Sequence, residues 1–240
     1  MKMSQLNLNE VFDFAADSPP EGDCKPMAVT HWSSQAFDLL YTLSRRVPIL
    51  SESHAIELLT SAGLPHSSAV EELNILRQMR WIERFRCVTS WREPLFPPVL
   101  TWRPGDEAED LRRLRVAARV TEPATAPRDV CYFVASRVTA NLFGGSYRGT
   151  ANAELIGQWM PWSRLYLHLR EHCPQVANRC DSRGIPHPGE RAEAMPPHLV
   201  FTTAEGVKKG VIAHLSTSSA HGLLTLHKHC VAKSLPYLLW

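Results

Sequence analysis

The sequence lacks a long apolar run, a basic leader and a large net charge. No run of apolar residues approaches the roughly 20 that a helix needs to cross a bilayer, so we expect no membrane partner. The first thirty residues lack the basic start and apolar middle of a secretory signal peptide, which predicts a cytoplasmic protein. A formal net charge of +2 is too small to predict nucleic-acid binding. Any prediction of nucleic-acid binding must therefore rest on where the charged residues are concentrated.

The cysteines lack any regular arrangement. Six cysteines occur at irregular spacings without a Cys-x-x-Cys pair, which argues against a disulfide framework and a paired zinc knuckle. We expect reduced thiols packed as small apolar groups and no bound cofactor. Apolar content of 44% and charged content of 21% are typical of a soluble globular protein, and 240 residues suffice for one large or two small domains. We favour two domains.

The stretch 51–103 has the clearest local pattern. A first helix is predicted from Ser51, with Ile56, Leu59 and Ala62 on one apolar stripe. Gly63 follows where the end of a helix favours a residue that tolerates positive φ.

A second helix is predicted after Pro65, over residues 67–80. Ser68 and Glu71 fit a capping box at its start. Its predicted apolar face contains Val70, Leu73, Leu76 and Met79.

Strands are predicted to follow these helices. Residues 81–88 alternate between apolar and polar, 91–95 suit a turn, and 99–102 are the expected return strand. Pro97 and Pro98 predict an irregular or edge position for that return. Together with a helix that begins near Trp32, the order of three helices and a hairpin predicts a winged helix-turn-helix over 31–104.

The exposed face of this module is rich in polar and basic residues, which suggests duplex DNA as a partner. Glu71 and Glu72 would repel phosphate, so the expected contact lies at the C-terminal half of the helix and on the wing. We expect Asn74 and Arg77 nearest the base edges and the remaining arginines on phosphate. The alternative is a module for protein contacts or dimerisation. The predicted DNA-binding residues are Asn74, Arg77, Arg80, Arg84, Arg86 and Arg92.

The remaining segments predict an α+β protein. Residues 1–30, acidic and interrupted by prolines, are expected to form a flexible lead-in, and 105–128 a helical linker. Strands at 130–134, 198–202, 209–215 and 237–240, with helices at 152–173 and 221–233, predict a small α/β domain over 129–240. Pro161 is expected to kink or divide the helix at 152–173.

Several short motifs carry a family resemblance. They are Arg80-Trp-Ile82, Arg103-Pro-Gly105, Thr139-Ala-Asn-Leu-Phe-Gly-Gly145, Leu165-Tyr-Leu-His-Leu-Arg170, His227-Lys-His-Cys230, Leu235-Pro-Tyr237 and Trp240. Together they resemble the replication-relaxation family of bacterial plasmid and mobile-element proteins. The resemblance implies a winged helix followed by a domain with the restriction-endonuclease-like fold.

The same resemblance implies that nuclease chemistry is lost. Nucleases of this fold hold a divalent metal with a Pro-Asp on one strand and an acidic-x-Lys on the next. Here His198 stands at the position of the aspartate, Ala213 and His214 at that of the second acid, and Leu215 at that of the lysine. The expected function is therefore a DNA-binding protein of mobile-element, replication or defence type, with a catalytically inactive nuclease-like domain.

Two alternatives remain open. One is a divergent metal-dependent nuclease that uses Glu154 or Glu171 together with histidines, and the other is a protein–protein interaction module in a larger DNA-processing assembly. Two groups of histidine and cysteine are candidate zinc ligands, although we interpret both as packed side chains. They are His168, His172, Cys173 and Cys180 in one group, and His198, His214, His221, His227, His229 and Cys230 in the other.

Overall fold

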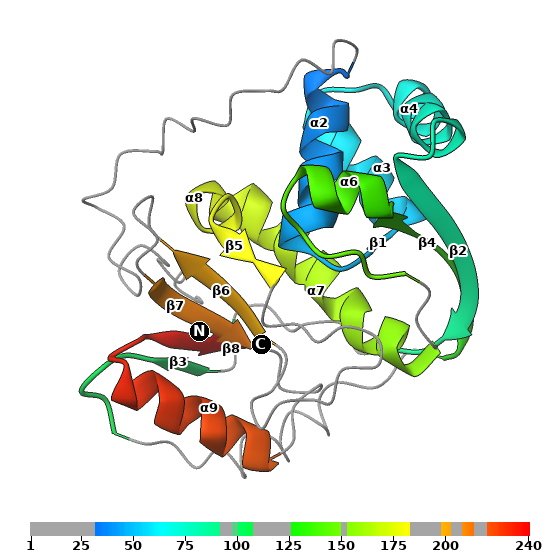
Figure 1. The fold of residues 1–240 in the computed structure, drawn as a ribbon. Coiled ribbons are helices and arrows are strands. Elements are labelled where there is room, and N and C mark those ends of the chain that lie inside the picture. The colour runs from blue at the N-terminus through cyan, green and yellow to red at the C-terminus, as the bar shows by residue number, and fades with distance from the viewer. Residues whose placement is uncertain are drawn as a thin grey trace, which may run out of the picture.

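The structure is a mixed α+β arrangement with two sheets, which confirms the predicted class (Figure 1). This computed structural model describes residues 32–91, 98, 100–107, 126–149, 153–182, 198–202, 208–213 and 220–240. The expected lead-in, most of the expected linker, Arg92, His214 and Leu215 lie outside these ranges. Within them, no helix is both long and apolar enough to span a membrane.

Three helical segments open the described chain. Helix α2 (Ser34–Tyr41) is capped by Ser33, whose hydroxyl accepts from the Ala36 N–H, and it continues into the π-helical segment η1 (Thr42–Arg46). Helix α3 (Glu52–Ser61) is capped by Ser51, whose hydroxyl accepts from the His54 N–H. Gly63 has a φ of +97°, as predicted for the residue that follows this helix.

Helix α4 (His66–Gln78) begins earlier than the sequence suggested. Its N-cap is Pro65, which makes no side-chain cap bond, so the predicted capping box of Ser68 and Glu71 is wrong. Because the helix already starts at His66, Ser68 lies within its first turn. Leu73 and Leu76 are buried as expected, whereas Met79 is exposed at the C-cap.

The first sheet contains β1 (Leu50–Ser51), β2 (Ile82–Thr89) and β4 (Arg128–Ala135) in the order β1-β4-β2. All its pairs are antiparallel, and β2 runs along the whole of β4. The prediction that residues 99–102 return alongside 81–88 is wrong. Strand β3 (Leu100–Trp102) instead pairs with the last strand of the chain, and β4 provides the return.

The second sheet has the order β3-β8-β7-β6-β5. Strands β5 (Cys180–Asp181), β6 (His198–Thr202) and β7 (Lys208–Ala213) form antiparallel neighbours. Strand β8 (Tyr237–Leu239) runs parallel to β7. A parallel pair requires a crossover, which helix α9 (Ala220–Ala232) provides while covering one face of the sheet (Figure 1).

A long central helix lies between the two sheets. Helix α7 (Ala153–His172) stays continuous through Pro161, so of the two expected effects the division is wrong and the kink stays a prediction. Trp159 and Leu165 are buried in it and belong to a core that also includes Leu199 of β6 and Leu58 of α3. Burial on both sides offsets the helix bond that Pro161 cannot donate. Two short helices, α6 (Arg137–Leu142) and α8 (Pro174–Ala177), complete the described part.

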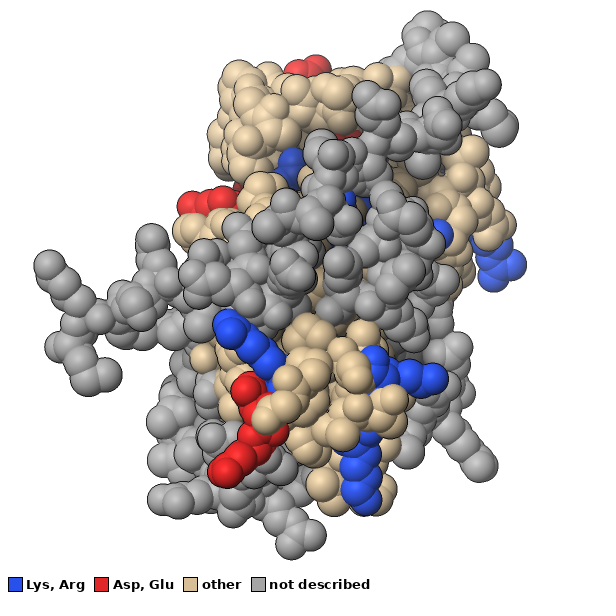
Figure 2. Space-filling view, turned by 90° about the vertical axis from the view of Figure 1, so that its left-hand side faces the viewer, with Lys and Arg blue, Asp and Glu red and all other residues tan. Residues whose placement is uncertain are grey.

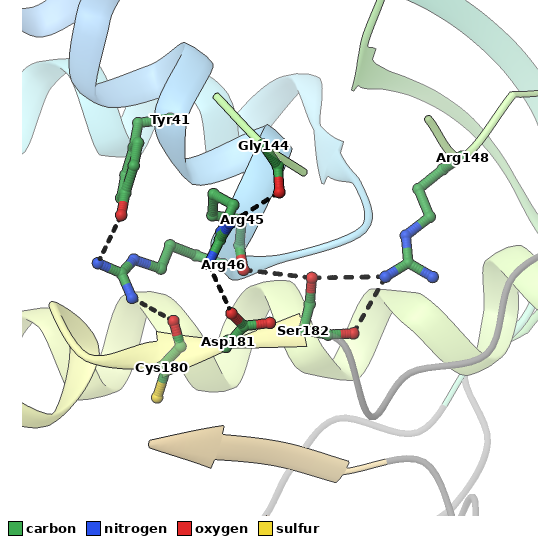
Figure 3. A network of polar contacts seen from close by, with 8 residues as sticks. All are labelled: Tyr41, Arg45, Arg46, Gly144, Arg148, Cys180, Asp181 and Ser182. Atoms are coloured by element: carbon green, nitrogen blue, oxygen red, sulfur yellow. Dashed lines mark hydrogen bonds and ion pairs between the residues drawn. The ribbon is translucent and has the colours of Figure 1, made fainter. Parts of the chain in front are cut away.

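A polar network joins η1 to the edge of the second sheet (Figure 3). Arg45 pairs with Asp181 at 3.0 Å and donates to the Gly144 carbonyl at 2.7 Å. The Arg46 guanidinium donates to the Cys180 carbonyl. Arg148, which is buried, donates to the Ser182 carbonyl at 3.0 Å. These bonds fix β5 against the first half of the chain.

Candidate nucleic-acid interface

The C-terminal half of α4 presents polar and basic side chains to solvent. Asn74, Arg77, Gln78 and Arg80 are all exposed. Among the described residues none is in side-chain hydrogen-bond or ion-pair contact with Asn74, Arg77 or Arg80. These groups are therefore available to a ligand.

Arg80 sits at a sharp reversal of the chain. Its φ is +59°, a left-handed conformation that is uncommon for a residue other than glycine. The reversal ends α4 and leads directly into β2, so Arg80 lies between the helix and the strand. Backbone strain of this kind is frequent at functional positions.

The acidic start of α4 is only partly exposed. Glu72 is half-buried and accepts a hydrogen bond from the Ser33 hydroxyl at 3.3 Å, so it faces α2. Glu71 is exposed. The carboxylate at this end that would oppose a phosphate is thus mainly that of Glu71.

The two arginines of β2 are already paired. Arg84 lies 2.9 Å from a carboxylate oxygen of Glu52, and this hydrogen bond is the main reason that the pKa of Arg84 is raised. The Arg86 Nε lies 2.8 and 2.7 Å from the two carboxylate oxygens of Asp129. That contact lowers the pKa of Asp129. A phosphate would have to compete with a carboxylate at either site.

Two of the positions that the resemblance compares with nuclease ligands, His198 and Ala213, lie together in the structure. His198 of β6 is the antiparallel partner of Ala213 of β7, and such partners project to the same face of a sheet. Both residues are buried, and the Ala213 carbonyl accepts from the Trp240 N–H at 2.9 Å. The structure therefore places an imidazole and a methyl group side by side in the second sheet.

The first candidate zinc group combines the buried Cys180, the half-buried His168 and Cys173 and the exposed His172. The rings of His168 and His172 lie 4.4 Å apart. Burial, followed by the charge of His172, lowers the pKa of His168 to about 4. Cys180 is fully buried, which raises its thiol pKa to about 12. In the part of the chain that the structure describes, no three His, Cys, Asp or Glu residues are placed to hold a metal ion.

Four members of the second candidate group lie on α9, where His221 is exposed and Cys230 is buried; His198 lies on β6, and His214 is outside the described residues. The His227 Nδ1 lies 3.0 Å from the Tyr237 hydroxyl, and its ring meets the ring of Trp102 edge-on. Cys230 is buried, which raises its pKa to about 12. These contacts make His227 and Cys230 part of the packing between α9 and the sheet.

The acids of the alternative nuclease lie far apart. Glu154 stands in the first turn of α7 and Glu171 in its last, and both are exposed. At 1.5 Å per residue their backbones are separated by about 25 Å. The two acids therefore do not share one site, and of the two it is Glu171 that lies beside a histidine, with an oxygen 3.5 Å from the His172 Nε2.

A polar cavity of about 380 Å³ lies where the start of α3 meets β4. His54 lines it, and burial together with Arg164 and Arg128 lowers the pKa of His54 to about 4. The Arg128 guanidinium stacks over the Trp91 ring at 3.9 Å. Sequence reasoning missed this cavity because nothing local shows that β4 lies beside residues 51–54. Its lining residues are Ser51, Glu52, Ser53, His54, Trp91, Arg128, Asp129, Val130, Cys131 and Met160.

The basic side chains elsewhere are dispersed. On the face shown in Figure 2, the described Lys and Arg side chains stand apart, with carboxylates and uncharged surface between them. The described residues of this face form no continuous basic strip.

Comparisons with known proteins give no match: no family model, no curated protein and no solved structure matches this chain. The resemblance to the replication-relaxation family therefore stays a prediction from short motifs.

Proposed function

We propose that this chain is a DNA-binding protein of mobile-element, replication or defence type, whose nuclease-like domain is catalytically inactive. In this proposal α2, α3, α4 and the sheet β1-β4-β2 form a winged helix. Helix α4 engages duplex DNA, and the second sheet serves as a platform for a protein partner or a second copy.

The order of elements supports the winged helix. Three helices precede a long antiparallel strand pair, and α3 and α4 are joined by a short link that contains Gly63 and Pro65. The wing is the pair β2–β4, and the segment between the two strands is an insertion into it. The second sheet likewise has the expected sequence of an antiparallel hairpin, a crossover helix and a parallel strand.

The observation that carries the DNA proposal is the free polar face at the end of α4. Arg77 and Arg80 have exposed guanidinium groups without a carboxylate partner among the residues that the structure describes. Asn74 lies about one turn before Arg77, and an Asn amide can bond an adenine edge through two hydrogen bonds. We assign base contact to Asn74 and Arg77 and phosphate contact to Arg80. Arg84 and Arg86 contribute less, because each must first leave its carboxylate.

The test is the affinity for a labelled random-sequence duplex, measured by fluorescence anisotropy at about 50 and about 200 mM salt. The wild-type protein binds, and its affinity falls steeply with salt. The Arg77→Gln/Arg80→Gln variant binds more weakly, and its slope of log affinity against log salt is flatter by about one per lost phosphate contact. Arg164→Gln on α7, where Arg164 pairs with Glu57, is the matched control and keeps the wild-type slope.

Base contact is tested separately with a binding selection from random duplexes. Asn74→Ala relaxes the preference at one or two positions, a loss of about 1–3 kcal/mol of discrimination, and leaves the salt slope unchanged. Wild-type protein that binds no duplex at the lower salt concentration would refute the proposed function.

A further inference from the structure

Two large apolar side chains are exposed on α4, the helix assigned above to DNA. Ile75 is 42% exposed and Met79 58%. The Met79 N–H donates to the Ile75 carbonyl at 2.9 Å, so the two residues are neighbours one helical turn apart. The buried side of α4 consists of Ala69, Leu73 and Leu76. Because successive residues of a helix lie about 100° apart around its axis, Ile75 stands outside this buried stripe, and the core does not require an apolar residue there.

A row of amides runs beside this apolar pair. Asn74 and Gln78 are both exposed and, like the apolar pair, lie one turn apart on α4. Each directly precedes a member of that pair in the sequence. Among the described residues, none makes a side-chain hydrogen bond to either amide. The end of α4 therefore carries two parallel rows, one of amides and one of apolar side chains.

These two rows match the major-groove edge of an A·T base pair. The adenine of such a pair presents N7 as an acceptor and N6 as a donor, which an Asn or Gln amide can bond with two hydrogen bonds. The thymine of the same pair carries a C5 methyl group, which apolar side chains contact, and a G·C pair has no such methyl group. An amide and an apolar side chain next to each other can therefore contact the two bases of one A·T pair.

The surroundings of the two rows favour DNA over a protein partner. Arg77 and Arg80 are exposed at the same end of α4, and positive charge there attracts a polyanion. Glu71 lies one turn before Ile75, and its carboxylate would repel phosphate, so the contact is limited to the end of the helix. In Figure 1, α4 lies at the outer edge of the described helices, where a major groove about 12 Å wide can receive it.

We propose that α4 recognises A·T pairs in the major groove through contacts with thymine methyl groups. Ile75 and Met79 contact the methyl groups, and Asn74 and Gln78 bond the adenines. This inference rests on the proposed DNA binding and adds to it a base preference and the apolar residues that determine it.

The test compares two duplexes that differ only in these methyl groups. One is the sequence that the wild-type protein enriches most strongly from random duplexes, which we expect to be rich in A·T pairs. The other is its copy with uracil in place of every thymine, which keeps the phosphates and the hydrogen-bonding groups of the bases. Measured by fluorescence anisotropy, the wild-type protein binds the uracil copy about fourfold more weakly for each methyl group that it contacts.

Alanine variants then assign the effect to α4. Ile75→Ala/Met79→Ala binds the two duplexes equally and keeps the wild-type salt slope, because no charge changes. Both side chains are exposed and alanine is a good helix former, so the variant stays folded, which circular dichroism checks. The matched control, Leu224→Ala/Val231→Ala on α9, removes two exposed apolar side chains elsewhere and keeps the wild-type preference for thymine.

The outcomes separate the thymine contact from DNA binding itself, and the comparison of the two duplexes on the wild-type protein needs no variant. Equal binding of both duplexes with a steep salt slope would overturn the thymine contact, favour a protein partner for the apolar pair and leave the proposed function intact. A preference for thymine that persists in Ile75→Ala/Met79→Ala would overturn the assignment to these two residues. Wild-type protein that binds no duplex would overturn both proposals.

Discussion

His198 and Ala213 face each other across the antiparallel pair β6–β7, in the interior of the second sheet. The positions that the sequence resemblance marks as former metal ligands are thus neighbours in space. Their side chains belong to the packing of the sheet, which explains why an alanine there is compatible with a stable fold.

We predict that an acid placed at Ala213 destabilises the protein. Ala213→Asp puts a carboxylate at a fully buried position, which costs about 3–5 kcal/mol of the free energy of unfolding. Urea unfolding followed by circular dichroism measures this loss. Ala153→Asp, at the exposed start of α7, is the control and changes stability by less than about 0.5 kcal/mol.

The wild-type protein should also leave supercoiled plasmid intact in Mg²⁺, Mn²⁺ or Zn²⁺. Gel electrophoresis of the incubated plasmid checks this expectation. Nicking that is lost on His198→Ala would contradict the inactive-nuclease proposal and favour the divergent nuclease.

A change at Asp129 should strengthen DNA binding. Asp129→Asn removes a negative charge beside β2 and releases Arg86 from its two-oxygen contact. The freed guanidinium can then meet a phosphate, so the salt slope steepens by about one and the affinity rises. The anisotropy assay measures both quantities. Glu57→Gln, which releases Arg164 on α7, is the control, and an equal gain there would contradict a specific role of β2.

His54 should make stability depend on pH. Its pKa is lowered from 6.5 to about 4, mainly by burial, and its Nδ1 has no hydrogen-bond partner in the described structure. Because the unfolded chain takes up the proton first, stability is lost as the pH falls from about 6.5 to about 4, and is fully present above that window. Between about pH 7.5 and about pH 4.5, the free energy of unfolding of the His54→Gln variant should fall by about 2–3 kcal/mol less than that of the wild-type protein.

Urea unfolding at those two pH values tests the His54 prediction. His168, whose pKa is lowered in the same direction, leaves a residual dependence in the variant. His66→Gln, at the exposed start of α4, serves as the control for loss of a histidine. A wild-type protein whose stability loss equals that of His54→Gln would disprove the prediction.

Two glycines should differ in their tolerance of alanine. A Cβ at Gly145 would overlap the backbone carbonyl of Ser44, so Gly145→Ala must displace the α6–η1 contact and costs more than about 2 kcal/mol. Gly63 has open space around its Cβ position, and Gly63→Ala costs only the strain of a φ of +97°, about 1–2 kcal/mol. Thermal unfolding compares the two. Equal losses would mean that the Ser44 contact adjusts freely.

Local patterns predicted the helices of the first half well. The periodicity of residues 51–62 and 67–80 gave α3 and α4, because each buries one apolar stripe. The capping-box prediction failed because α4 starts at His66, directly after Pro65, which leaves Ser68 inside the first turn of the helix. The alternation of residues 81–88 likewise gave β2.

Long-range pairing was beyond local reasoning. Residues 99–102 and 130–134 both had the composition of strands, and proximity in sequence favoured the nearer segment as the partner of β2. The structure pairs β2 with the farther strand, β4. The partners of Arg84 and Arg86 were therefore also missed, since Glu52 and Asp129 approach β2 only through the arrangement of this sheet.

The position of β3 has a consequence for synthesis of the chain. Leu100–Trp102 lies in the first half of the sequence, yet its partner is Tyr237–Leu239 at the very end. During translation β3 stays unpaired until Tyr237–Leu239 has also left the ribosome, so the second sheet cannot complete before that point. Pairing between segments so far apart in the sequence is slow. The unpaired edge of β3 makes the nascent chain prone to aggregation, which chaperones counteract.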